Sequence, residues 1–221
     1  SNEAGFQYVI PELQRRTKLG GVYLGVGPEQ NFTYIAALRP RLAIIFDIRR
    51  GNLHEHLLYK ALFEMSTDRA DFVSRLFARR RPAGLDTASS PDSLFASFLR
   101  AAPDSALYRK LLGDVTDALT KKHGFALTPD DVRGIEYVYG ALFTGGPTID
   151  YSFPNFSRGR TPTYFDLMVQ TDGLGAQRSY LANEQNYRVV RELQLKNLLV
   201  PVVGDFAGPK AIRAVGQYLK E

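Results

Sequence analysis

The stretch "VYLGVGPEQNFTYIAALRPRLAIIFDIRR", from Val22 to Arg50, decides the fold. Its first apolar run suits a strand buried on both faces and ends in the turn Gly25-Val26-Gly27. A proline that suits the first turn of a helix comes next, and the proline that closes "IAALRP" stops that helix. A second apolar run ends at Asp47. The stretch therefore predicts two parallel strands joined by a right-handed helical crossover.

Outside this stretch the pattern is mainly helical, and the apolar run at 198–203 indicates a third strand. "TPDDV" reads as a helix start with Thr128 as the N-cap. Residues 145–162, rich in glycine, proline and aromatic residues, are expected to form a long loop. Apolar periodicity predicts helices at 7–18, 52–66, 68–80, 92–101, 105–123, 129–143, 163–171, 179–196 and 208–220.

The predicted fold class is α/β, with a Rossmann-like parallel sheet and helices on both of its faces. A large helical insertion separates the second and third strands. Residues 1–66 and 196–221 form the expected nucleotide-binding core, and 67–195 form the insertion, which carries the long loop. We expect the first strand to lie between the other two. We also expect the helices of 67–145 to cap the carboxyl edge of the sheet, where ligands bind in open α/β sheets.

Composition narrows the class of protein. The 221 residues are 44% hydrophobic, as in ordinary globular chains, and no apolar run approaches the roughly 20 residues of a membrane span. Cysteine is absent, which excludes disulfides, a thiol nucleophile and Cys-ligated metals, and we expect a cytoplasmic protein. The net charge of +5 is scattered, and there is no basic stripe typical of nucleic-acid binding.

The glycine turn and the helix after it favour a nucleotide, because free N–H groups and the positive end of the helix dipole meet there. Asp47 lies 20 residues after Gly27, the spacing at which an acidic group meets ribose hydroxyls. Dinucleotide-binding proteins favour a third glycine where this chain has Gln30. A P-loop motif is also absent. S-adenosylmethionine, which has no pyrophosphate, is the remaining common ligand of this edge.

Four segments carry a family resemblance: "GVYLGVGPEQNFTYIAALRP", "FDIRR", "LLYKALFEMSTDRADFVSRLFARRRP" and "NLLVPVVGDFAGPKAIRAVGQYL". They resemble the class I (Rossmann-like) S-adenosylmethionine-dependent methyltransferases. Nearly the whole chain is similar to a bacterial family of unknown function with such a methyltransferase-like domain. Proteins with this resemblance usually continue with another strand, so we expect the native chain to extend beyond Glu221.

The resemblance implies roles for several residues. Both glycines of the turn line the cofactor loop, the acid that ends the second strand binds the ribose, and the residue after it packs beside the adenine. "VVGDF" resembles the third-strand motif whose acid recognises the adenine amino group. The cofactor residues so implied are Gly25, Gly27, Asp47, Ile48, Asp205 and Phe206. The chain departs from the family pattern at Tyr23, where an acid is common, and at Glu29, which replaces a glycine.

Each candidate has an ordinary alternative. Glu29 and Gln30 either hold the amino or carboxylate group of the cofactor or are plain first-turn residues, where Glu is favoured by the helix dipole. Asp47 is either a ribose ligand or a strand-end cap. Asp205 either contacts adenine or makes a turn and helix cap.

Substrate contacts are expected from the long loop and its border. Tyr151, Arg160 and Tyr164 either close over a substrate or order an aromatic-rich surface loop. "HEH" at 54–56 does not predict a metal site, because residues two apart on a helix do not face each other. The sequence contains no nucleophile elbow with a neighbouring histidine, so it does not indicate a hydrolase.

The leading functional hypothesis is a methyltransferase-like protein that binds S-adenosylmethionine, with an unknown methyl acceptor. The rival hypothesis, from another class, is a non-catalytic nucleotide-binding or interaction module on the same fold, because a fold does not decide a function. A dinucleotide oxidoreductase is disfavoured by Gln30. The sequence indicates neither an oligomeric state nor a catalytic base.

Overall fold

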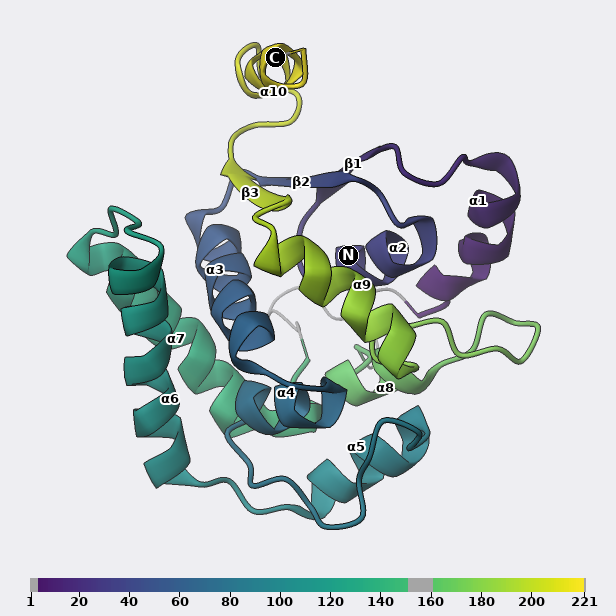
Figure 1. The fold of residues 1–221 in the computed structure, drawn as a ribbon, viewed down its shortest axis with the longest axis vertical. Coiled ribbons are helices and arrows are strands. Elements are labelled where there is room, and N and C mark those ends of the chain that lie inside the picture. The colour runs from purple at the N-terminus through teal and green to yellow at the C-terminus, as the bar shows by residue number, and fades with distance from the viewer. Residues whose placement is uncertain (1–3, 151–160, 221) are drawn as a thin grey trace.

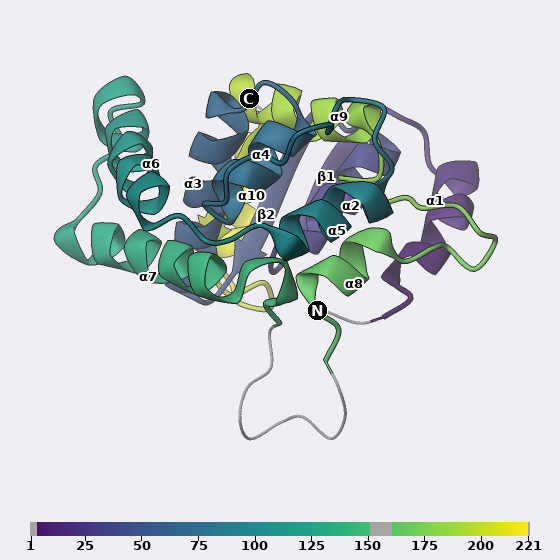
Figure 2. The same cartoon turned by 90° about the horizontal axis from the view of Figure 1, so that it is seen from below.

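The computed structural model describes residues 4–150 and 161–220. Helices and strands appear at the positions that the periodicity predicts, with bounds that differ by a few residues (Figures 1 and 2). Within the described residues, no helix has both the length and the apolar character that a membrane crossing requires. In chain order the elements are η1 (Phe6–Val9), α1 (Ile10–Arg16), β1 (Val22–Val26), α2 (Gln30–Leu38), β2 (Leu42–Asp47), α3 (Arg50–Met65), α4 (Arg69–Leu76), α5 (Pro91–Arg100), α6 (Ser105–Asp117), the π-helix η2 (Ala118–Lys122), α7 (Pro129–Gly145), η3 (Gly146–Thr148), α8 (Tyr164–Val169), α9 (Glu184–Leu195), β3 (Leu199–Val203) and α10 (Ala211–Tyr218).

The three strands form one parallel sheet with the order β1-β2-β3. The expectation that β1 is central is therefore wrong, and β2 takes that place. The burial patterns agree with this order: four consecutive residues of β2 are buried, whereas Val22, Leu24 and Val26 of β1 leave one face of their strand exposed. A strand with apolar side chains on both faces is stabilised most when helices cover both faces and other strands pair with both edges. The sequence of β1 is as apolar as that of β2, but β1 lies at the edge of the sheet and one of its faces is exposed.

Helices lie on both faces of the sheet, as predicted, although the α10 face of β1 stays exposed. Side chains of a strand alternate between faces, and β2 follows this rule closely. Its Ala43 and Ile45 join the large core under α2, α3 and α9, while Ile44 and Phe46 join a small cluster with Val215 of α10. Figure 1 shows α10 alone on one side of the sheet and the other helices on the opposite side.

The helices between α3 and α9 do not form the expected cap at the carboxyl edge. Of these, α4, α6 and α7 pack on α3, on the side away from the sheet, and α7 is its main neighbour (Figure 1). The short helices α5 and α8 pack on each other and on η3. Their buried residues belong to the same hydrophobic cluster as Ala43 and Ile45 of the sheet. Apolar side chains on several faces of α3 account for this, because both the sheet and α7 can pack on them. The beginning of α7 does reach the edge, where Asp131 binds Arg50.

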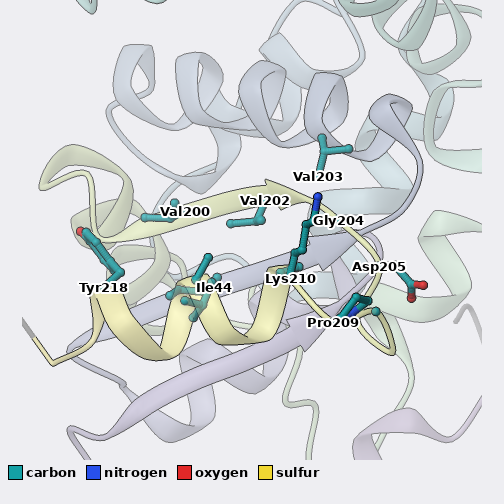
Figure 3. Close-up of a pocket in the computed structure, with 13 residues that line it drawn as sticks. Ile44, Val200, Val202, Val203, Gly204, Asp205, Pro209, Lys210 and Tyr218 are labelled. Carbon is teal, nitrogen blue, oxygen red and sulfur yellow. The ribbon is translucent and has the colours of Figure 1, made fainter.

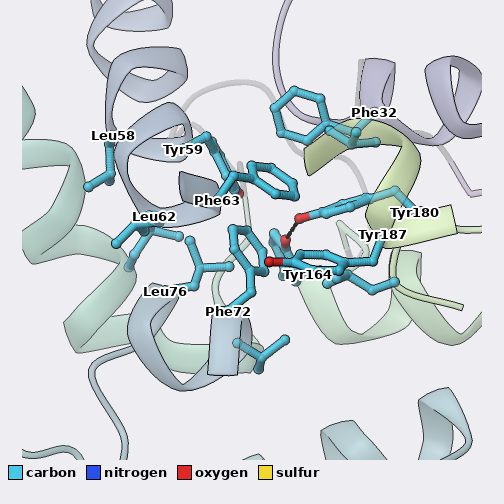
Figure 4. Packing of buried hydrophobic residues seen from close by; sticks show 14 of the residues in the cluster. Phe32, Leu58, Tyr59, Leu62, Phe63, Phe72, Leu76, Tyr164, Tyr180 and Tyr187 are labelled. Carbon is cyan, nitrogen blue, oxygen red and sulfur yellow. Dashed lines mark hydrogen bonds between the residues drawn. The ribbon is translucent and has the colours of Figure 1, made fainter. Parts of the chain in front are cut away.

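An aromatic cluster joins the layer under the sheet to the outer helices (Figure 4). The ring of Phe63 on α3 stacks on Phe72 of α4 with 4.3 Å between centroids, and on Tyr187 of α9 with 5.4 Å. Phe32 of α2 meets Phe63 edge-on at 5.5 Å. Four helices are thus held through one side chain, and α2 is the helix that begins at the glycine turn.

Candidate functional site

The carboxyl ends of the three strands meet at one edge, as the parallel arrangement requires. Val26 lies opposite Phe46, and Asp47 lies opposite Val203. Two backbone bonds continue this pairing beyond the strands: Gly27 N–H donates to Phe46 O at 3.1 Å, and Gly204 N–H donates to Asp47 O at 2.9 Å. Asp47 therefore stands between the glycine turn and the loop that follows β3.

The two glycines of the turn are needed for different reasons. Gly27 has φ 89°, a left-handed conformation that favours glycine. A Cβ atom at Gly25 would lie 2.2 Å from Oδ1 of Asn31 and 2.6 Å from the ring of Tyr23. The Tyr23 hydroxyl donates to that same Asn31 oxygen at 2.7 Å. Internal packing thus accounts for Gly25, and the tyrosine that replaces the usual acid supports Asn31.

Two polar side chains that the sequence analysis missed hold the turn from inside. The Asn31 amide nitrogen lies 2.7 Å from Pro28 O and also contacts the two carbonyls before it. His56 Nε2 lies 3.1 Å from Gly27 O. A signal for Asn31 was present, since it follows Gly27 by one helical turn. His56 stands on a buried side of α3, where a histidine needs a partner.

Glu29 and Gln30 are both buried at the start of α2. Burial raises the pKa of Tyr164, and the nearby charge of Glu29 raises it further. Since Tyr164 is fully buried in the main core, Glu29 lies on the core side of the turn. Gln30 is the first residue of α2 and lies close to the turn, as expected. Of the two interpretations of Glu29, this placement favours a first-turn residue that faces the interior.

Asp47 and Ile48 follow β2 directly. Asp47 is half-buried, and its Oδ1 accepts the N–H of Arg49 at 2.7 Å. Its charge is close enough to affect His56, whose pKa it raises against a larger opposite effect of burial. The side chain of Ile48 is 68% exposed. An acceptor group beside an exposed apolar side chain fits a ribose next to an adenine ring.

Asp205 and Phe206 lie at the other end of the same edge. Asp205 is exposed, and its Oδ1 accepts the N–H of Ala207 at 2.9 Å, which is the plain turn that was the alternative interpretation. Phe206 is half exposed and meets Phe46 edge-on at 5.6 Å. The carboxylate keeps acceptor capacity for a second donor.

The three predicted substrate residues do not come together in the part of the chain that the structure describes. Tyr151 and Arg160 lie outside the described residues. Tyr164 is fully buried, and its hydroxyl is hydrogen-bonded to that of Tyr180 (Figure 4). The prediction of a substrate contact for Tyr164 is therefore not supported by its placement. It followed from the neighbouring loop composition, which carries no information on burial.

A second cluster lies beside the edge, where α3 and α7 both begin. Asp131 is buried, and Arg50 binds it with two nitrogens at 2.6 and 2.9 Å. His54 Nε2 lies 2.8 Å from the same carboxylate, and Thr128 completes a capping box with it. Hydrogen bonds from Arg50, His54 and Thr128 hold the pKa of Asp131 well below its usual range. His54 and His56 have different partners, Asp131 and the carbonyl oxygen of Gly27.

A groove of about 810 Å³ separates α10 from β2 and β3 (Figure 3). Its lining is mostly aliphatic, with Tyr218 at one end and Asp205 at the other. None of the lining residues belongs to the glycine turn or is Asp47. The groove is therefore a gap between a helix and the sheet, and it touches the candidate site only at the loop after β3.

Comparison with known proteins gives a family but no activity. A family model described as a domain of unknown function (DUF7790) matches residues 1–86 and 92–221. The chain belongs to this family. No curated protein matches the chain. The DUF7790 match covers the strand-edge residues and the helical layers together, so both are parts of one family pattern.

Proposed function

We propose that the protein binds S-adenosylmethionine at the edge where its three strands end and transfers the methyl group to an acceptor. The observation that carries this proposal is the position of Asp47 between the glycine turn and Asp205, on adjacent parallel strands. A ribose held by Asp47 would place an adenine ring over the exposed side chain of Ile48. The methionine end would then point to the turn and the first N–H groups of α2.

The sheet supports the Rossmann-like part of the proposal. The order β1-β2-β3 is that of the first three strands in doubly wound nucleotide-binding sheets, read from the inside outward. In this interpretation α4 to α9 are a helical insertion between the second and third strands. The insertion has packed on α3, and its contribution to the site is the Arg50–Asp131 contact at the start of α7.

In this proposal the protein binds the cofactor and orients it toward the methyl acceptor. S-adenosylmethionine supplies an activated methyl group when it is bound. The chain supplies a hydrogen-bond acceptor for the ribose at Asp47 and a turn whose shape is held from within by Asn31. Rate would come from placing the acceptor in line with the methyl group, since the cofactor carries the reactive chemistry. No residue is assigned as a general base.

A non-catalytic module on the same fold is the second candidate, and one observation favours it. Gly25 is explained by its contact with Asn31 and Tyr23, and Asp205 by its own turn. Glu29, which stands in the glycine motif, lies toward the core. These residues would look the same in a protein that binds no nucleotide at this edge.

Calorimetric titration with S-adenosylmethionine tests the role of Asp47. We expect Asp47→Ala to weaken binding by about 1–3 kcal/mol, because polar partners of the carboxylate would be left unpaired. Asp117→Ala is the matched control, since Asp117 is an exposed acid on α6 that forms a surface ion pair with Lys121. If Asp47→Ala binds as tightly as the unchanged protein, Asp47 is only a strand-end cap.

The same titration with NAD tests the choice of nucleotide. Gln30 occupies the first position of α2, where a dinucleotide-binding protein needs a glycine for close approach. We expect NAD to bind at least about tenfold more weakly than S-adenosylmethionine, and Gln30→Gly to narrow that gap. Tight binding of NAD by the unchanged protein would contradict the methyltransferase proposal. Binding of neither compound would favour the non-catalytic module.

A further inference from the structure

The glycine turn presents its carbonyl oxygens to the interior of the protein. Asn31 Nδ2 lies 3.2 Å from Val26 O, 3.3 Å from Gly27 O and 2.7 Å from Pro28 O. An amide group has only two hydrogens, so these three contacts must share them. Asn31 alone therefore cannot give each of the three carbonyl oxygens its own hydrogen. Its contact with Gly27 O, the middle carbonyl, is the longest of the three.

His56 supplies the missing donor. It comes from α3, is almost completely buried, and its Nε2 lies 3.1 Å from Gly27 O. A carbonyl oxygen can only accept, so the ring carries its hydrogen on Nε2. Nδ1 has no hydrogen-bond partner within the described residues. The ring is also held edge-on against Phe32 of α2, with 5.5 Å between centroids.

The protonation of His56 suits this role. Burial lowers its pKa from 6.5 to about 4, although the bond to Gly27 O and the charge of Asp47 act in the opposite direction. At neutral pH the ring therefore has one N–H group. A neutral ring leaves the charge of Asp47 unpaired by His56 and available to a ligand. A permanently positive side chain at position 56 would compete with the ligand for the carboxylate of Asp47.

We propose that His56 is a positioning residue, which holds the glycine turn through Gly27 O and so sets where the turn meets a ligand. Part of this proposal rests on the proposed function, because the ligand used to test it is S-adenosylmethionine. The positioning of the turn itself does not depend on any ligand. It follows from the Nε2 contact, the burial of the ring and the left-handed backbone of Gly27.

The first experiment uses the free protein, labelled with ¹⁵N. Long-range ¹H–¹⁵N correlations should show His56 as the neutral Nε2–H form between pH 6 and 8 (a working range at least about 2 units above its pKa). His56→Leu should move the backbone resonances of Gly27 and its neighbours. His56→Gln, whose side-chain amide can still donate, should restore them at least in part. A hydrogen on Nδ1, or unchanged Gly27 resonances in His56→Leu, would overturn the proposal.

The second experiment measures binding of S-adenosylmethionine to the same variants. We expect about tenfold weaker binding in His56→Leu, and recovery in His56→Gln to within about threefold. His123→Leu is the control, because it removes a partly buried histidine that is paired with Glu64, at the far end of α3 from the turn. Equal weakening in His123→Leu, or no recovery in His56→Gln, would reduce His56 to a stability role and overturn the proposal. If the turn responds in the first experiment but no variant binds the compound, the positioning role stands and the proposed function fails.

Discussion

Phe63→Ala is expected to lower the free energy of unfolding by about 3–5 kcal/mol, the cost of removing a buried aromatic side chain and leaving a cavity. Phe63 stacks on Phe72 and Tyr187 and meets Phe32 edge-on, so its ring contacts side chains from three other helices. The surrounding rings are held by separate helices, so we expect them to close only partly around the space. Urea unfolding followed by circular dichroism would measure the loss from the midpoint and the slope.

Two further variants make this measurement specific. Phe63→Leu keeps much of the side-chain volume, so it should lower the free energy of unfolding clearly less than Phe63→Ala does. Tyr137→Ala removes an aromatic ring of α7 that is 79% exposed, and it should change the free energy of unfolding by less than about 0.5 kcal/mol. A loss in Phe63→Ala no larger than that of Tyr137→Ala would contradict the central position of Phe63 in the core.

The free energy of unfolding is expected to fall by about 3 kcal/mol as the pH is lowered from 6.5 to 4, through His56 alone. Burial lowers the pKa of this histidine from 6.5 to about 4 in the folded protein. In that window the unfolded chain takes up a proton that the folded chain does not, so acid favours unfolding. Below about pH 4 both states are protonated and this contribution stops growing.

Urea unfolding at several pH values would measure this slope, and His56→Leu should flatten it between pH 4.5 and 6.5. The carboxylate of Glu64 acts at lower pH. Burial alone would raise the pKa of Glu64, but hydrogen bonds from Lys122, Lys60 and His123 lower it to about 2, so its stabilisation is lost only below about pH 4.5. An unchanged slope in His56→Leu would mean that His56 is not buried in its neutral form.

The sequence was sufficient for elements whose signals are local. The N-cap at Thr128 is present as a complete capping box, and the strand that leads into the glycine turn begins and ends where the apolar run does. Asp47 and Asp205 could be placed at one edge because parallel strands leave no other choice. These features depend on neighbours within a few residues or on a rule of topology.

Features that depend on distant contacts were not predictable in the same way. The order of the strands depends on the pairing of β2 with β3 over a long sequence distance, and the burial of Tyr164 depends on contacts with Tyr180 and Phe77. The part played by His56 requires α3 to pack beside the turn. Glycine and acid patterns indicate where a ligand can bind, but not which inner side chains hold the loop in shape.

The pairing of β2 with β3 has a consequence for how the chain folds. Val22 pairs with Leu42 across a single helix, whereas Ala43 pairs with Leu199, across about eight times as much chain. By the loop-closure relation the second pairing costs about 2 kcal/mol more in chain entropy. During refolding, β1 and β2 can associate early, and the free edge of β2 stays open until the intervening helices have packed. We therefore expect the addition of β3 to be a late step in refolding, since non-local strand pairs form slowly.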